Sequence, residues 1–267
     1  MSSIAEPALS QTAEAARPSP RTSFLDLPFD RLDQAGTLAA LLSVPAGDRF
    51  RYLVTPNVDH MIRIADDPAI ARLYREAWLC INDSRILTQL ARTCAIDLPA
   101  VPGSDLVAAL LTHPDLAADT PILIVGGGDG LAQAVASLCG LTRVAQIRPP
   151  MGLRKDPAKL AATVEAIEAQ PARFVILAVG SPQQEILAAA VAQRGRAQGV
   201  GLCIGAGLEF LVGDRPRAPA VFRALNLEWL FRLACEPTRL ARRYLIDGPR
   251  IFRLVWEYRR GVRSPDA

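Results

Sequence analysis

The sequence predicts an α/β fold, in which a parallel sheet of about six strands is flanked by helices and followed by an all-helical C-terminal appendage. Short apolar runs, typical of buried parallel strands, alternate with stretches of helical apolar spacing between residues 52 and 204. Many of these runs end in Gly, Pro, Asn or Asp, which interrupt strands and begin turns. Beyond Gly213 the strand signals stop and prolines punctuate a helical pattern. This alternation is characteristic of a Rossmann-like sheet with helices on both faces.

The boundaries of the predicted elements follow from the apolar periodicity and the turn residues. Strands are predicted at residues 52–54, 78–81, 122–125, 144–147, 174–179 and 201–204. Helices are predicted within 29–49, 58–77 (two short helices meeting at Asp67-Pro68), 85–90, 105–111, 131–138, 158–169, 186–193, 226–235 and 251–258. Residues 1–22 are rich in Ala, Ser, Pro and Thr, and we expect a disordered tail there. The chain therefore divides into this tail, a Rossmann-like domain (23–213) and an arginine-rich helical appendage (214–267).

Composition restricts the class of protein. Half of the 267 residues are hydrophobic and 21% are charged, as in a well-packed globular protein. The five cysteines are scattered and the two histidines, His60 and His113, are far apart, so no metal site is expected. The N-terminus has no secretory signal pattern, and no apolar run reaches the ~18 residues of a membrane span. We therefore expect a cytoplasmic protein with free thiols.

Positive charge is concentrated at the C-terminal end. From Arg215 onward the sequence has 12 Arg, no Lys and 5 acidic residues, a net charge of +7, against +3 for the whole chain. This asymmetry indicates an anionic partner such as a phospholipid, a diphosphate or a nucleic acid. Residues 251–258 place apolar side chains on one broad face and arginines largely elsewhere, as in an interfacial helix. A helix that packs on the sheet with solvated arginines would have the same composition, so both interpretations stay open.

Polar side chains follow three of the predicted strands. Thr55 and Asn57 come after the first, Asp83 after the second, and Gln184 and Glu185 after the fifth. The carboxyl ends of parallel strands meet at one edge of a sheet, where ligands bind, so we expect these residues to line one site. Each residue also has a structural interpretation, because all of them stand where a helix begins. For Asp83 alone a helix N-cap is the commoner role, and a carboxylate at Glu185 suits a helix dipole.

A glycine-rich turn, GGGDG at 126–130, joins the third strand to its helix. Gly126 and Gly127 can present backbone N–H groups to a phosphate at a helix N-terminus. The pattern is not a full G-x-G-x-x-G, and a tight turn that needs positive φ would use the same residues.

Taken together, the motifs resemble those of the WecG/TagA/CpsF glycosyltransferase family. The resemblance spans about Thr55 to Tyr244, and GSPQQE and the C-terminal tract are its most specific parts. The motifs are TPN at 55–57, Asp83, GSD at 103–105, GGGDG at 126–130, GSPQQE at 180–185, GAGLEFLVGDRPRAP at 205–219 and NLEWLFRLACEPTRLARRY at 226–244.

The resemblance implies an inverting, UDP-sugar-dependent transferase of bacterial surface polysaccharide biosynthesis. Such an enzyme moves N-acetylmannosamine, its uronic acid, glucose or a similar sugar onto an undecaprenyl-diphosphate-linked sugar, as a peripheral protein at the inner face of the plasma membrane. Asp83 matches the family's proposed catalytic base, which takes the proton from the acceptor hydroxyl, with Thr55 close by. Asn57 and Gln184 match residues that line the same pocket. The resemblance implies no cofactor and no metal.

By the same resemblance, the appendage folds over the site at the membrane and supplies arginines. The matching positions are Arg232, Arg239 and Arg242. A guanidinium fork suits a diphosphate better than an ammonium group does, and the appendage contains no Lys.

Two departures from the family pattern affect the site. Ser84 stands where the family usually has Gly. The family also usually carries an Arg shortly before its Gly-x-Asp motif, where this chain has the uncharged stretch around Ala100. Either another arginine, with Arg85 and Arg148 as candidates, replaces that cation, or the donor sugar differs.

Two other functions stay open. The glycine-rich turn would suit a nicotinamide-dependent oxidoreductase, although no strand-end acid follows it at the spacing that such enzymes use. The basic tail would suit a non-enzymatic nucleic-acid-binding module, although aromatic residues are few and the arginines alternate with Leu, Ile, Phe and Trp. We expect a UDP-sugar, a polyprenyl-diphosphate-linked acceptor and an anionic membrane surface as partners, and no nucleic acid. The apolar content is compatible with a homo-oligomer.

Overall fold

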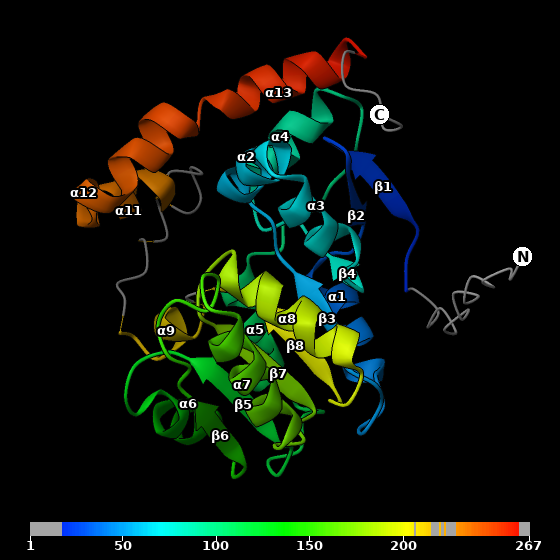
Figure 1. Cartoon of the computed structure of the whole chain (residues 1–267). Helices are drawn as coiled ribbons and strands as arrows, with labels where there is room; N and C mark the ends of the chain where they lie inside the picture. The colour runs from blue at the N-terminus through cyan, green and yellow to red at the C-terminus, as the bar shows by residue number, and fades with distance from the viewer. Residues whose placement is uncertain (1–17, 206, 215–218, 220–221, 223–227, 262–267) are drawn as a thin grey trace, which may run out of the picture.

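A computed structural model describes residues 18–205, 207–214, 219, 222 and 228–261 of the chain (Figure 1). Its centre is an all-parallel, six-stranded sheet with the strand order β4-β3-β8-β7-β5-β6. This confirms the predicted fold class, and each predicted strand overlaps an observed one. The strands are β3 (Arg51–Val54), β4 (Leu79–Cys80), β5 (Ile122–Gly126), β6 (Val144–Ile147), β7 (Phe174–Ala178) and β8 (Val200–Cys203).

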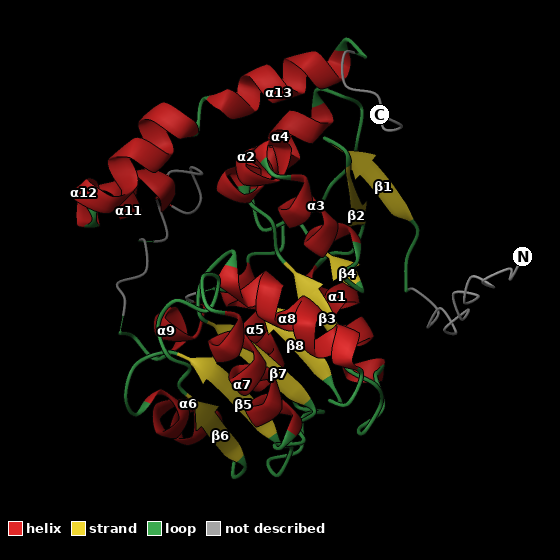
Figure 2. Cartoon of the chain, in the orientation of Figure 1, coloured by secondary structure: helices red, strands yellow, loops and turns green. Residues whose placement is uncertain are grey.

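Helices cover both faces of the sheet (Figure 2). One face carries α2 (Val58–Asp66), α3 (Pro68–Arg75), α4 (Arg85–Arg92), α7 (Pro157–Glu168) and α8 (Gln183–Arg194). The other face carries α1 (Gln34–Ser43), α5 (Gly103–Leu111), α6 (Leu131–Cys139) and α9 (Gly207–Leu211).

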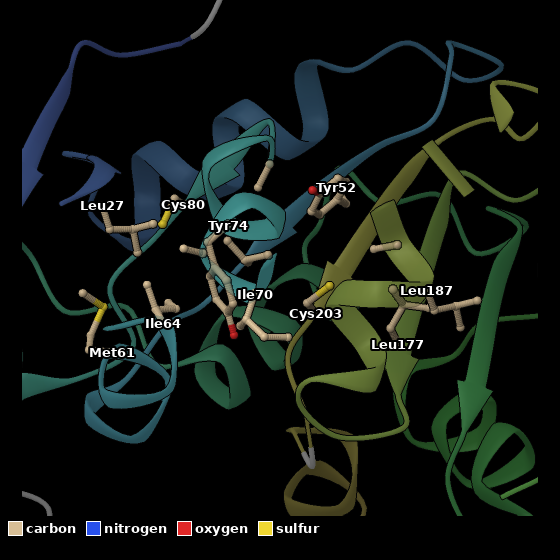
Figure 3. Close-up of a cluster of buried hydrophobic side chains, with 14 of the residues drawn as sticks. Leu27, Tyr52, Met61, Ile64, Ile70, Tyr74, Cys80, Leu177, Leu187 and Cys203 are labelled. Carbon is tan, nitrogen blue, oxygen red and sulfur yellow. The ribbon is translucent and has the colours of Figure 1, made fainter. Parts of the chain in front are cut away.

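The core consists of two apolar clusters separated by the sheet. In β7, Val175 belongs to the cluster on one face and its neighbour Phe174 to the cluster on the other, because successive side chains of a strand point to opposite faces. Figure 3 shows the first cluster, in which Tyr74 of α3, Leu187 of α8 and the more N-terminal Leu27 lie around the strand residues. Since both faces of β7 are buried, its sequence is a continuous apolar run rather than an alternating one.

A β-hairpin that the sequence did not predict covers the β4 end of the sheet. Its strands pair antiparallel, and the buried Asp30 fastens it by accepting hydrogen bonds from the Cys80 N–H (2.8 Å) and from Arg21 Nε (3.2 Å). The predicted tail up to residue 22 and the predicted helix from residue 29 are therefore wrong at this point, and α1 begins only after its N-cap Asp33. Residues 1–17 of the predicted tail lie outside the described part of the chain. The two strands are β1 (Arg21–Phe24) and β2 (Leu27–Asp30).

The C-terminal region is helical, as predicted, and its last helix is fastened to the core. Arg250 donates to both carboxylate oxygens of Asp66 at the end of α2 (2.9 and 2.6 Å), and Tyr258 donates to the Ser23 carbonyl (3.1 Å). Figure 1 shows α13 lying along α2 and α4. No helix in the described ranges is both long and apolar enough to cross a membrane. The helices are α11 (Glu228–Cys235), α12 (Pro237–Ala241), the π-helix η1 (Arg242–Asp247) and α13 (Arg250–Arg259).

Helix α13 packs on the domain and also exposes large apolar side chains. Ile251, Leu254 and Val255 are buried in the core cluster, so one face packs on the domain. Phe252 and Trp256 are 60% and 51% exposed, so a second apolar face is left to the surroundings.

Gly126 ends β5 at a point where the neighbouring strand leaves no room for a side chain. Its φ is +101°, and an added Cβ would lie 2.7 Å from the carbonyl oxygen of Ala178 on β7. The adjacent Gly127 also has positive φ, and a Cβ there would meet the Leu131 side chain. The glycines are therefore required by the close approach of β5 to β7 and by the tight turn itself.

We predict that Gly126→Ala lowers the free energy of unfolding by about 1–3 kcal/mol, because of left-handed strain and overlap with β7. Gly128→Ala, where a Cβ would meet no atom within 4 Å, should change it by less than about 0.5 kcal/mol. Urea denaturation of both variants measures the difference. Equal stabilities would show that the close approach of the two strands does not constrain position 126.

Candidate active site

A cleft of about 560 Å³ opens at the carboxyl ends of β3, β7 and β8. After β3 and β7 the chain enters α2 and α8 on one face of the sheet, whereas after β8 it enters α9 on the other. Diverging exits from neighbouring strands leave a crevice, which is where open parallel sheets bind ligands. The C-terminal helices close one side, because Phe231, Leu240 and Tyr244 line the same cleft.

Asp83, which follows β4, is held in this cleft by two donors. Its Oδ1 accepts a hydrogen bond from the backbone N–H of Gly103 (2.7 Å), the first residue of α5. Its Oδ2 accepts one from Asn57 Nδ2 (3.4 Å). The N-terminus of a helix favours negative charge, so this setting suits an ionised carboxylate. The geometry thus presents a fixed carboxylate to the cleft.

The helix that directly follows Asp83 is capped by its neighbour. Ser84 Oγ accepts from the Leu87 N–H (3.3 Å) and is the N-cap of α4. The interpretation of Asp83 as the cap of that helix is therefore wrong. Its carboxylate points instead to the start of α5, which has no side-chain cap of its own.

Thr55 and Gln184 join the ends of neighbouring strands. The buried Thr55 hydroxyl donates to the Cys203 carbonyl (3.0 Å), which links β3 to β8. The Gln184 side-chain carbonyl accepts from the Gly205 N–H (2.9 Å), which links the start of α8 to the turn after β8. These two bonds fix the floor of the cleft around β8.

Glu185 holds the Gln184 amide in this orientation. Gln184 Nε2 donates to Glu185 Oε1 (2.8 Å), and the Glu185 side chain is fully buried. Its other oxygen, Oε2, has no hydrogen-bond partner among the described residues. Burial raises the pKa of the Glu185 carboxyl, against the opposing effect of the Gln184 amide. Glu185 therefore acts on the cleft through Gln184 rather than by lining it.

Helix α2 begins inside the cleft. Asn57 is its N-cap, with Oδ1 accepting from the N–H groups of Asp59 (3.2 Å) and His60 (3.4 Å). The same Asn57 side chain thus starts α2 with its oxygen and supports Asp83 with its nitrogen. The first turn of α2 is positioned relative to the carboxylate by this one amide.

Two arginines meet on a single carboxylate at the cleft wall. Arg63 donates to Asp59 Oδ2 (2.8 Å) and to Ser181 Oγ (2.8 Å). From the other side, Nη2 of Arg243 on η1 lies 3.4 Å from the same Asp59 oxygen. Burial, followed by the charges of Arg243 and Arg63, lowers the pKa of His60 to about 3, so this neighbouring side chain is neutral at physiological pH.

The structure brings most of the residues predicted from strand ends into one cleft. Thr55, Asn57, Asp83 and Gln184 all line it. Gly126 and Gly127 are not among its lining residues. The carbonyls of their turn are instead bound by the Gln146 side-chain amide, which donates to Gly126 (2.9 Å) and to Gly128 (3.0 Å).

The arginines expected from the sequence are placed differently. Arg85 and Arg148 do not line the cleft, and Arg148 pairs with Asp129 beyond the end of β5. Arg242 does not line it either, since its side chain is 82% exposed and lies 3.9 Å from Asp247. The side chains of Arg232 and Arg239 lie outside what the structure describes.

Sequence reasoning missed Asp59, Arg63 and Arg243. A signal for the first two was present, because Asp59 and Arg63 stand four residues apart at the start of a helix that follows a site strand, and such residues share a helix face. Arg243 had no such signal, because its position in the cleft depends on the π-helical conformation of η1.

Among the described residues, no group of three or more His, Cys, Asp or Glu side chains has an arrangement that could hold a metal ion. The fold thus places a held carboxylate, Asp83, in a cleft at the strand ends. Residues 22–265 match the family described as "Glycosyl transferase WecG/TagA/CpsF family". The match covers nearly the whole chain, so the protein belongs to this family and is a glycosyltransferase. The resemblance identified from the motifs is confirmed.

We predict that Glu185→Gln will alter how stability depends on pH. A raised carboxyl pKa in the folded state means that ionising Glu185 costs stability, so the wild type should lose stability relative to Glu185→Gln as pH rises above the ordinary value of 4.5. The amide preserves an acceptor for Gln184, so the variant should fold. Chemical denaturation between about pH 4 and pH 8 measures the gap. If the stabilities of the two proteins changed equally with pH, the Glu185 carboxyl would not have a raised pKa in the folded state.

Proposed function

We propose that this glycosyltransferase moves a sugar from a UDP-sugar to a polyprenyl-diphosphate-linked sugar, with inversion at the anomeric carbon. The observation that carries the proposal is the Asp83 carboxylate, fixed at the cleft by Gly103 and Asn57. A direct displacement requires a general base that takes the proton of the attacking hydroxyl. A carboxylate held at a helix N-terminus and facing a substrate-sized cleft suits this role.

The other cleft residues have supporting roles in this proposal. Asn57 orients the base, while Thr55 and Gln184 hold the strand ends that form the floor. Glu185 positions Gln184. Thr55 and Asn57 both line the cleft, and their polar groups are the ones in this proposal that contact sugar hydroxyls. The donor sugar is one of those that the family uses, such as N-acetylmannosamine, its uronic acid or glucose.

The family assignment replaces the oxidoreductase hypothesis, because the glycine-rich turn on which it rested does not line the cleft. Close packing of β5 against β7 accounts for Gly126 without a dinucleotide.

We further propose that the enzyme acts as a peripheral protein on an anionic membrane, making a lipid-linked intermediate of a surface polysaccharide. The support is a set of exposed apolar side chains on η1 and α13, which we call the apolar ridge: Leu245 (58% exposed), Ile246 (67%), Phe252 (60%) and Trp256 (51%). Arginines accompany these side chains, and Arg260 lies over the Trp256 ring at 3.9 Å. Exposed aromatic and aliphatic groups among arginines are typical of helices that lie in a lipid interface.

We predict that Asp83→Asn lowers the turnover number by about 100- to 10,000-fold, the usual contribution of a general base. The amide oxygen can still accept from Gly103, so the melting temperature should change little. The assay follows UDP release with a panel of UDP-sugars and a polyprenyl-diphosphate-sugar analogue.

Asp97→Asn is the matched control, because Asp97 is 69% exposed and pairs with Arg31 away from the cleft lining. It should retain wild-type turnover. Acceptor-dependent UDP release at the wild-type rate by Asp83→Asn would remove this carboxylate from the mechanism. No release with any donor by the wild-type protein would contradict the proposed reaction.

The double variant Phe252→Ala/Trp256→Ala should weaken binding to phosphatidylglycerol vesicles about tenfold or more, because two apolar side chains no longer enter the interface. Leu138→Ala, which removes an exposed apolar side chain (57%) from α6 on the other face of the sheet, should leave binding unchanged. Vesicle co-sedimentation measures both. Equal binding by the three proteins would contradict docking through the apolar ridge.

A further inference from the structure

Among the charged residues of the described cleft lining, acidic side chains outnumber arginines. Asp59, Asp83, Glu209 and Glu236 line it, whereas Arg63 and Arg243 are the Lys or Arg side chains among its described lining residues. A diphosphate entering this space meets four carboxylates and needs cations close to it. Among the described residues, these two arginines are the ones placed to receive such a group.

Arg63 and Arg243 come from different parts of the chain and converge on one point. Arg63 belongs to α2 of the sheet domain, and Arg243 belongs to η1 of the C-terminal region. Both approach the single oxygen Oδ2 of Asp59, at 2.8 and 3.4 Å. Two guanidinium charges thus share one carboxylate, which leaves a local excess of one positive charge.

Donor groups of the pair are left for a ligand. A guanidinium has five N–H donors, and the Asp59 and Ser181 contacts of Arg63 use one nitrogen each. Arg243 makes its ion pair through Nη2, and its buried Nε has no hydrogen-bond partner among the described residues. Both side chains are 31% exposed, so they are held in place but reach the cleft.

The pair is connected to the proposed base through Asn57 and Asp59. Asn57 donates to Asp83 with its nitrogen and accepts from the Asp59 N–H with its oxygen. Asp59 in turn holds both arginines. A ligand bound to the arginines is therefore placed relative to the base by α2 itself.

We propose that Arg63 and Arg243 together form a binding site for a diphosphate group, with Asp59 holding the two guanidinium groups at a fixed separation. The proposal rests on the proposed function and specifies how the cleft receives its substrate. Guanidinium forks match phosphate oxygens in a bidentate manner, and positive charge at a departing diphosphate stabilises the transition state of transfer. The pair supplies the cation that the uncharged stretch around Ala100 lacks.

The site is complete only when the C-terminal region is docked, since one of its two cations comes from η1. Helix η1 packs on α2, and α13 fixes the following segment to the far end of α2 through Arg250 and Asp66. The same helix α2 thus holds Arg63, receives Arg243 and binds α13.

The test compares nucleotides that differ by one phosphate. Binding of UDP and UMP to the full-length protein is measured by calorimetry for the wild type, Arg63→Ala and Arg243→Ala. We expect each substitution to weaken UDP binding by about 10- to 100-fold and UMP binding by less than about threefold, because hydrogen bonds to a charged phosphate are lost. Arg243→Lys, which keeps the charge without the fork, should fall between wild type and Arg243→Ala.

A second measurement distinguishes the two diphosphates of the reaction. If UDP binding is unchanged but the KM for a water-soluble polyprenyl-diphosphate-sugar rises by the same factor, the site holds the acceptor's diphosphate and the inference stands. Arg72→Ala, an exposed arginine paired with Glu76 on α3, is the control and should change neither quantity.

Three results would overturn the inference. They are equal losses for UDP and UMP, no change in either measurement, and a loss in Arg242→Ala that Arg243→Ala does not show. If the wild-type protein transfers sugar while the two alanine variants behave normally, the diphosphate site fails and the proposed function stands. If the wild type neither binds UDP nor transfers sugar, the proposed function itself fails.

Discussion

The hydrogen bonds that hold Asp83 are the constraint on which the site depends. They join the residue after β4 to the N-terminus of α5, through Gly103, and to the cap of α2, through Asn57. These contacts exist because β4 and β3 are neighbours and β3 pairs with β8, so that strand ends far apart in sequence meet at one edge. Thr55 and Gln184 then fix the position of β8 between its neighbours. The donors that hold the Asp83 carboxylate therefore come from distant segments that the strand order brings together.

Helix α2 links the chemistry to the C-terminal region. Its N-cap Asn57 supports Asp83, its second turn carries Arg63, and its end binds Arg250 through Asp66. A helix that is contacted along its length by the appendage couples the docking of that appendage to the shape of the cleft. In our proposal, the docked C-terminal region therefore carries the lipid-facing surface and also contributes to the diphosphate site.

Much of the fold could be predicted because both faces of the sheet are buried, so strands such as β7 are continuous apolar runs ending in Gly180. The hairpin was missed because its turn residues, Leu25 and Asp26, adopt positive φ (52° and 61°) without glycine. The alternation of Leu27 and Phe29 is too short to separate a strand from a helix start. Strand-end polar residues were found because sheet topology brings them together, whereas the choice between Arg242 and Arg243 depends on the π-helical turn of η1.

The stereochemical course of transfer tests the central claim most directly. One carboxylate acting once, as a base on the acceptor hydroxyl, requires a single displacement at the anomeric carbon, and hence inversion. The anomeric configuration of the product, determined by NMR with a UDP-sugar that supports turnover, should be opposite to that of the donor. Retention of configuration would require either two successive displacements through a covalent intermediate or an internal-return route. That result would contradict the role given to Asp83.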